Sequence, residues 1–228
     1  MAGQPFENRP NPKSDACQDA YAILCNANDS VRSFLDIFET LRKTRKAKGT
    51  STDEEQDLLR AMVLFAGAGL DSMVKQLIRD ALPTVVDVDE GATVRFKDYI
   101  DKRLAGGENI SRKFLADVLG DRNPRNRLVN QLISDLTSNS LQSAEELLKV
   151  AAYFNIPSDR ICKDVSQLKK IFIARNQIGH EMDIDFQQFN RSRRPRAKDK
   201  MVEYTTELLK VAATFLAEVD SKLSAGVP

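Results

Sequence analysis

The chain has 228 residues, of which 42% are hydrophobic and 29% are charged. This length allows one large or two small domains with a substantial core, and the composition is that of a soluble globular protein. The formal net charge of +1 excludes a polyelectrolyte that binds nucleic acid through its overall charge. Any affinity for nucleic acid must therefore come from local patches.

The N-terminal segment, residues 1–14, is polar and contains prolines, and we expect it to be flexible. It lacks the apolar stretch of a signal peptide, and no uninterrupted apolar run approaches the length that crosses a bilayer. The three cysteines, Cys17, Cys25 and Cys162, are odd in number and lack the close spacing of zinc ligands. We therefore expect a cytoplasmic protein with reduced thiols and no membrane association.

Apolar residues in the first part of the chain recur at helical spacing. Between residues 16 and 48 they repeat every three or four positions, as on one face of a long helix. This face comprises Leu24, Ala27, Val31, Phe34, Leu35, Phe38 and Leu41. A second helix is predicted from a cap at Ser51 or Thr52 to about Leu82, where Pro83 stops it. Its middle is apolar on nearly all sides, so it should be the most buried helix, and its small residues should let neighbouring helices approach closely.

Shorter helices separated by turn signals are predicted between residues 92 and 160. The run 84–88 before them has the composition of a strand, although no partner strand can be identified. A further helix should run from Lys163 to about Gly179, and a last one from about Lys198 to Leu223. The buried face of this last helix comprises Met201, Tyr204, Leu208, Val211, Phe215 and Val219. The sequence thus predicts an all-α fold, with residues 15–225 forming one up-and-down helical bundle with extra helices in its middle.

The only histidine of the chain, His180, ends the segment RNQIGH, which begins at Arg175. On an ideal helix Asn176 and His180 share a face, and Arg175 lies about 100° around the axis. We expect Gly179 to end the helix in the left-handed conformation, which would free His180 to turn toward Arg175 or toward a second subunit. RNA cleavage without a metal needs a cation for the phosphate and a group that titrates near neutrality. The simpler interpretation is that both charged side chains only complement the dipole of the helix C-terminus.

The pattern R-[N/D/H]-x-x-x-H at the end of the penultimate long helix resembles the signature of the HEPN superfamily, whose all-helical domains are often dimeric ribonucleases. The resemblance covers the helical body, and RNQIGH is its specific part. It implies that Arg175 binds the scissile phosphate, that His180 acts as general base or acid, and that Asn176 orients one of them or contacts RNA. It also implies attack by the 2′-hydroxyl on the adjacent phosphorus, without metal or cofactor, leaving a 2′,3′-cyclic phosphate.

The resemblance implies partners as well. Each chain supplies one histidine, whereas the reaction is best served by an acid and a base, so we expect a homodimer with the two motifs face to face. Members of the superfamily include toxins and phage-defence effectors, which implies RNA as substrate and an antitoxin or defence-system protein as a further partner. A catalytically silent helical module that dimerises or binds a partner or nucleotide is the alternative, and such members tend to lack the arginine–histidine pair.

Acidic residues follow the motif directly. Glu181, Asp183 and Asp185 alternate along the segment after His180 and could be ligands of a divalent metal in a metal-dependent nuclease. We favour a solvated acidic turn, because a metal site needs ligands that converge from several elements.

A basic loop, residues 183–199, joins the motif helix to the last helix. Its candidate RNA-binding residues are Arg191, Arg193, Arg194, Arg196 and Lys198. Pro195 keeps the middle of the loop from being helical. We expect this loop to be flexible and to follow a phosphate backbone beside the motif. A nuclear-localisation signal or a plain solvated connection is the alternative.

Overall fold

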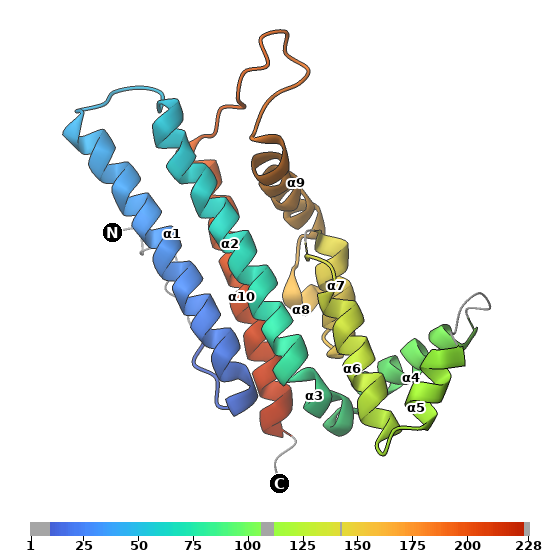
Figure 1. Cartoon of the computed structure of the whole chain (residues 1–228). Coiled ribbons are helices and arrows are strands. Elements are labelled where there is room, and N and C mark those ends of the chain that lie inside the picture. Colours follow the sequence, from blue (N-terminus) through green and yellow to red (C-terminus); the bar gives the residue numbers. More distant parts are fainter. Residues whose placement is uncertain (1–9, 106–111, 142, 226–228) are drawn as a thin grey trace.

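The computed structural model describes residues 10–105, 112–141 and 143–225. In these ranges every regular element is a helix, and the protein is the all-α bundle that the sequence predicts (Figure 1). Four of the helices hold the candidate site: α1 (Gln18–Thr44), α2 (Asp53–Asp80), α9 (Val165–Glu181) and α10 (Lys198–Ala225). The long helices α1, α2 and α10 lie side by side, and α9 packs against α2 and α10.

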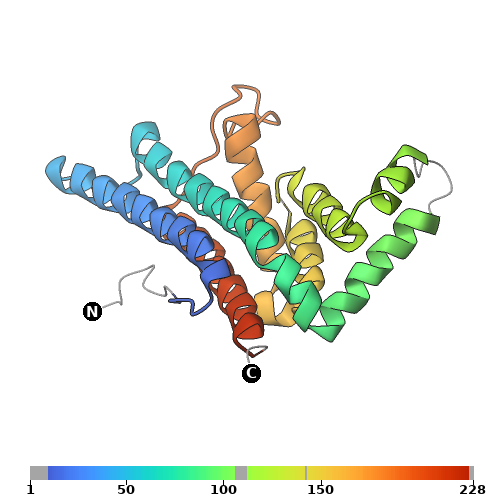
Figure 2. The ribbon, with the colours of Figure 1, turned by 60° about the horizontal axis from the view of Figure 1, so that its bottom comes forward.

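The middle of the chain forms a group of shorter helices to one side of the long ones (Figure 2). They are α3 (Leu82–Val88), α4 (Glu90–Ala105), α5 (Arg112–Leu119), α6 (Pro124–Thr137), α7 (Ala144–Tyr153) and α8 (Ser158–Ile161). The strand considered for the run 84–88 is wrong, since this run lies in α3. Pro83 occupies the first turn of α3, where its missing N–H would have had no helical acceptor. The proline therefore starts a helix here, and α2 ends before it at Asp80.

Thr52 caps α2 as predicted. Its hydroxyl accepts a hydrogen bond from the Glu55 N–H, and the Glu55 carboxylate accepts one from the Thr52 N–H at 2.9 Å. This capping box satisfies two backbone donors that the first helical turn leaves without partners. Arg42 and Arg45, at the end of α1, pair with the same buried carboxylate. The box therefore also fixes the connection between α1 and α2.

The helix α2 forms the centre of the core, as its composition predicts. A side chain at Gly69 would place its Cβ 2.4 Å from that of Ala27 on α1, so the glycine is needed for the close approach of the two helices. Phe65 is an exception on this buried helix, because 47% of it is exposed. Contrary to the expectation from the sequence, α2 is long and apolar enough to span a bilayer, and 56% of its most apolar window is buried, as in a core helix.

Two further expectations concern the termini. Residues 1–9 of the N-terminal segment lie outside the described residues. Nearer the bundle, the backbone N–H groups of Lys13 and Ser14 bond to the Asp220 carboxylate at 2.8–3.0 Å, which attaches the end of this segment to α10. The apolar face predicted for α10 is buried along its whole length.

All three cysteines are free thiols. Burial, with Asp220 and Asp80 nearby, raises the pKa of the Cys17 thiol to about 12.

Candidate active site

The RNQIGH segment forms the last turns of α9, and the helix continues through Gly179 to Glu181. The expectation that Gly179 ends the helix is therefore wrong. Its missing side chain serves packing instead, because a Cβ there would lie 3.3 Å from a methyl group of Leu64 on α2. Met182 (φ 52°) and Asp183 (φ 60°) adopt the left-handed conformation instead. Non-glycine residues adopt it here because the N–H of Asp183 reaches the Gln177 carbonyl at 2.9 Å and its side chain is bonded in the interior.

Arg175 points from α9 across a second glycine of α2. A Cβ at Gly67 would lie 3.3 Å from Cγ and 3.5 Å from Nε of this arginine. The glycine thus makes room for the stem of the side chain, which lies half-buried between the two helices. This packing limits the rotamers of Arg175 and fixes the direction of its guanidinium group.

The three residues of the motif converge at the end of α9. Nη1 of Arg175 donates to the side-chain oxygen of Asn176 at 3.1 Å and lies 3.5 Å from Nε2 of His180. His180 is exposed, while Arg175 and Asn176 are half-buried. A phosphate that reached the guanidinium group would therefore lie beside a ring nitrogen of the histidine. The contact forms with His180 still in the helix, so no unwinding at Gly179 is needed.

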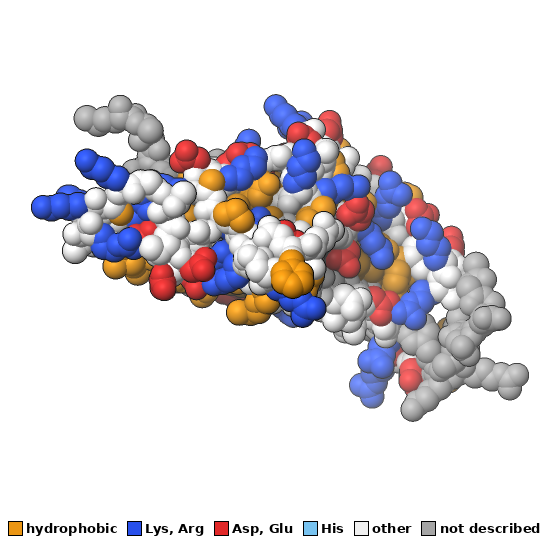
Figure 3. Space-filling view, turned by 90° about the horizontal axis from the view of Figure 1, so that it is seen from above, with side chains coloured by type: hydrophobic (Ala, Val, Ile, Leu, Met, Phe, Trp, Pro, Cys, Tyr) orange, Lys and Arg blue, Asp and Glu red, His pale blue; other side chains and the backbone are white. Residues whose placement is uncertain are grey.

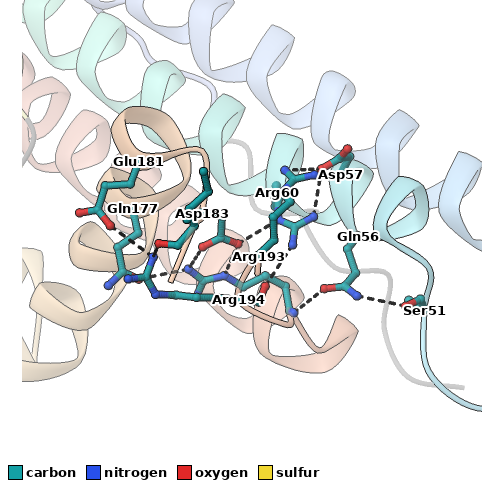
Figure 4. Close-up of polar contacts among 11 residues, drawn as sticks. Ser51, Gln56, Asp57, Arg60, Gln177, Glu181, Asp183, Arg193 and Arg194 are labelled. Atoms are coloured by element: carbon teal, nitrogen blue, oxygen red, sulfur yellow. Dashed lines mark hydrogen bonds and ion pairs between the residues drawn. The ribbon is translucent and has the colours of Figure 1, made fainter. Parts of the chain in front are cut away.

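The acidic segment after the motif is not the solvated turn that we expected. Asp183 is completely buried and accepts hydrogen bonds from Nε of Arg60 and Nε of Arg196, each at 2.9 Å (Figure 4). Burial by itself would raise the pKa of Asp183, but the hydrogen bonds and charges of Arg196 and Arg60 outweigh it and hold this pKa below its ordinary value. The carboxylate thus stays charged in the interior and connects the end of α9 to α2.

Most arginines of the basic loop pair with carboxylates of the protein itself. Arg193 pairs with Asp57 at 2.6 Å, and Arg194 pairs with Glu181 at 3.2 Å (Figure 4). Arg196 also donates to the Gln177 side chain, and Lys198 pairs with Glu39 of α1 at 2.7 Å. Four of the five candidate RNA-binding side chains thus compensate carboxylates of the protein itself.

Arg191, the fifth candidate, differs from the other four. It lies exposed in the loop, with a left-handed backbone (φ 47°). Within the ranges that the structure describes, its side chain has no carboxylate partner. Among the five candidate side chains, Arg191 is therefore the one most readily available to bind a phosphate.

The acids of this segment face cations, which does not support the metal-dependent alternative. Asp183 is directed at Arg60 and Arg196, while Glu181 and Asp185 lie near Arg194. In the described part of the chain, no group of three or more His, Cys, Asp or Glu side chains is placed to hold a metal ion. A divalent ion at Asp183 would have to displace two guanidinium groups.

Comparison with known proteins leaves the family open: no family model, no curated protein and no solved structure matches the chain. The resemblance seen in the sequence therefore still rests on the RNQIGH pattern in an all-α chain. Arg60 and Asp57 were not predicted as residues that support the site, because Asp183 and Arg193 lie more than a hundred residues away from them. Gly67 belongs to the small residues expected to allow close helix approach, but its contact with Arg175 was not predicted.

Proposed function

We propose that the protein is a metal-independent endoribonuclease of the HEPN type. The observation that carries the proposal is the convergence of Arg175, Asn176 and His180 at the exposed end of α9. The cation is held in position by packing on α2, and the proton-transfer group beside it is accessible to a substrate. Action as a toxin or phage-defence effector, with a controlling partner protein, is part of the proposal and rests on the resemblance.

In the proposed reaction Arg175 binds a non-bridging oxygen of the scissile phosphate. Its guanidinium group then stabilises the negative charge that grows on these oxygens in the transition state, and its fixed direction avoids reorganisation at that moment. Asn176 keeps the guanidinium group in place through the bond to its side-chain oxygen. His180 takes the proton of the 2′-hydroxyl, whose oxygen attacks phosphorus.

The bond from phosphorus to the 5′-oxygen breaks, which leaves a 2′,3′-cyclic phosphate and an alkoxide that must gain a proton. The chain has one histidine, and it is engaged as the base at that moment. We assign the acid to His180 of a second copy, so that a homodimer with opposed motifs supplies both groups.

The test is cleavage of an end-labelled single-stranded RNA in the presence of EDTA. We expect His180→Ala to lower the rate about 10²–10⁴-fold, the usual contribution of a general acid or base. Arg175→Ala should lower it about 10²–10³-fold, as when a group that stabilises transition-state charge is removed. Arg160→Ala, which removes an exposed arginine of α8, is the matched control and should cleave at the wild-type rate.

Two product analyses complete the test. Mass spectrometry should find a 2′,3′-cyclic phosphate, and one deoxynucleotide 5′ of the scissile phosphate should block cleavage there. Wild-type rates in either motif variant would contradict the catalytic assignment. Activity lost in EDTA and restored by magnesium or manganese would favour a metal-dependent reaction instead.

A further inference from the structure

The loop between α9 and α10 ends in a tip, residues 185–192, that is folded on itself. Ile184 and Arg193 form an isolated antiparallel bridge at its base, and the N–H of Asp185 bonds to the Ser192 carbonyl at 2.9 Å. Inside the tip the Ser192 hydroxyl donates to the Gln188 side chain at 2.7 Å, and the Asp185 carboxylate accepts from Gln188 at 3.1 Å. These bonds, with the buried Asp183 below them, give the tip a preset shape.

Two aromatic rings lie on the outside of this tip. Phe186 is 58% exposed, and Phe189 is fully exposed. Figure 3 views this end of the molecule, where hydrophobic side chains lie on the surface beside lysine and arginine side chains. The internal hydrogen bonds of the tip would form equally well with polar residues at these two positions. A loop that is folded by its own hydrogen bonds and exposes two large apolar rings therefore indicates a binding surface.

The surroundings of the rings are polar and basic. Gln187 and Gln188 separate the two phenylalanines, and Asn190 and Arg191 follow Phe189. The one acid of the tip, Asp185, is used in internal hydrogen bonds. Aromatic rings between amides and an exposed cation are the combination on which single-stranded nucleic acids bind, with bases on the rings and phosphates on the cation.

The rings also lie close to the candidate active site. Phe186 is six residues from His180, so at most ~20 Å of extended chain separates them. The folded base of the loop makes the real separation shorter, because the chain turns back at Met182 and Asp183. A strand with one phosphate on Arg175 would have bases a few nucleotides away within reach of the tip.

We propose that the tip is a stacking surface for single-stranded RNA, in which Phe186 and Phe189 take bases that flank the scissile phosphate. This inference rests on the proposed function, since it assigns the substrate class of that same site. A duplex would hide the faces of its bases from these rings, so the surface selects unpaired segments and loops. Gln188 and Asn190 bond within the tip, so the exposed Gln187 is the amide between the rings that suits the edge of a base. It would gain nothing from a lipid interior or an apolar protein groove.

The test is binding rather than cleavage, and it uses the full chain carrying His180→Ala so that RNA stays intact. The probe is a single-stranded RNA of mixed sequence with one 2-aminopurine, followed by anisotropy and by the fluorescence of that base. Phe186→Ala and Phe189→Ala should each weaken binding roughly 5- to 150-fold, the range for loss of one base–aromatic stack. The salt dependence of the affinity should stay as in the parent, because neither ring carries charge.

Three variants make the test specific. Phe189→Trp should keep the affinity and the change in 2-aminopurine fluorescence, whereas Phe189→Leu, equally apolar but without a π face, should lose both. Leu119→Ala removes an exposed apolar side chain of α5 (76% exposed) and should bind as the parent does. A duplex of the same sequence should bind more weakly, with no dependence on the two phenylalanines.

Unchanged affinity in both alanine variants, or full affinity in Phe189→Leu, would overturn the stacking surface. Loss of the dimer in the alanine variants would also overturn it, because the rings would then contact a second copy of the chain. Binding to anionic vesicles that depends on the rings would overturn it as well. If the wild-type chain fails to cleave RNA but binding depends on the rings, the catalytic proposal fails and the stacking surface stands. If His180→Ala abolishes cleavage while the ring variants bind normally, the stacking surface fails and the catalytic proposal stands.

Discussion

Asp183 carries a charge where water has no access, and two arginines from different parts of the chain compensate it. Arg60 belongs to α2 and Arg196 to the segment before α10, so one carboxylate joins three elements around the end of α9. The same aspartate offers its backbone carbonyl to the N–H of Arg194 at 2.8 Å. The position of His180, three residues earlier, depends on this arrangement.

We predict that Asp183→Asn destabilises the protein at pH 7 by about 3–5 kcal/mol, the cost of removing one partner from a buried ion pair. The charge of Arg60, which is 3% exposed, would remain in the interior with Asp57 as its other carboxylate. Urea unfolding measures the difference. Asp185→Asn, which removes a half-buried acid of the same loop, is the control and should cost much less.

The same variant gives a pH dependence. The pKa of Asp183 is lower in the folded protein than the ~3.9 of an unfolded chain, so its contribution to stability is complete above that value. The contribution falls as the pH drops through the folded pKa, where the wild-type side chain becomes neutral like asparagine. The stability gap between wild type and Asp183→Asn should therefore narrow below about pH 4. If the difference in stability between wild type and Asp183→Asn stays constant down to pH 2, the negative charge of Asp183 does not stabilise the protein.

Local and distant interactions explain which site residues the sequence could predict. Arg175, Asn176 and His180 could be selected because RNQIGH resembles a known signature and lies on one predicted helix. That Arg175 and His180 meet within an unbroken helix was not predicted. Asp183 could not be selected in this way, since its partner Arg60 lies 123 residues away and no local pattern links them. Gly179 shows the limit of a local rule: a glycine near a helix end often takes the left-handed conformation, but here α9 continues to Glu181 and Met182 takes it.

At the scale of elements, periodicity predicted the long helices well because each buries a continuous apolar face. The expected first helix, residues 16–48, is α1, preceded by one 3₁₀ turn (Asp15–Cys17). The four-residue α8 was not predicted, since one turn is too short to show a period. The ion pairs of the basic loop were not predicted, because its composition shows the arginines but not the carboxylates of α1, α2 and α9 that pair with them.

The basic residues of the loop therefore form two groups: those that pair with carboxylates of the protein, and Arg191, which is exposed. We predict that Arg191→Gln weakens RNA binding and lowers the slope of log affinity against log salt by about one, as for one lost phosphate contact. Its thermal stability should stay near that of wild type. Arg193→Gln, the matched change at a residue paired with Asp57, should lower stability instead and leave the salt slope nearly unchanged. Titrations between low and physiological salt, with a melting curve for each variant, measure both. Equal salt slopes for Arg191→Gln and wild type would remove Arg191 from the interface.

At the scale of the whole molecule, α1 and α2 expose apolar side chains along their shared edge. Ile37, Leu41 and Phe65 are 42–47% exposed, and Phe65 meets Phe34 edge-on with 5.0 Å between ring centroids. Such a surface on two long helices suits contact with a second copy.

We predict that the protein is a dimer in sedimentation experiments and that Phe65→Asp makes it monomeric without unfolding it, because this ring is already half in water. Val94→Asp, at a comparably exposed position on α4 (54%), is the control and should stay dimeric. The monomer should retain RNA binding at the loop tip but lose most of its cleavage activity, since it lacks the second histidine. A monomeric wild-type protein with full activity would contradict the shared site.

Mixing subunits separates a shared site from two independent ones. If both histidines of a dimer take part in each cleavage event, a heterodimer with one His180→Ala subunit is inactive. With equal amounts of the two chains, exchanged to a random mixture, the activity should then fall to about one quarter of that of wild-type dimers alone. Independent sites would leave about one half. Cleavage rates across several mixing ratios distinguish a quadratic from a linear dependence of activity on the wild-type fraction. A linear dependence would mean that a single chain carries out both proton transfers.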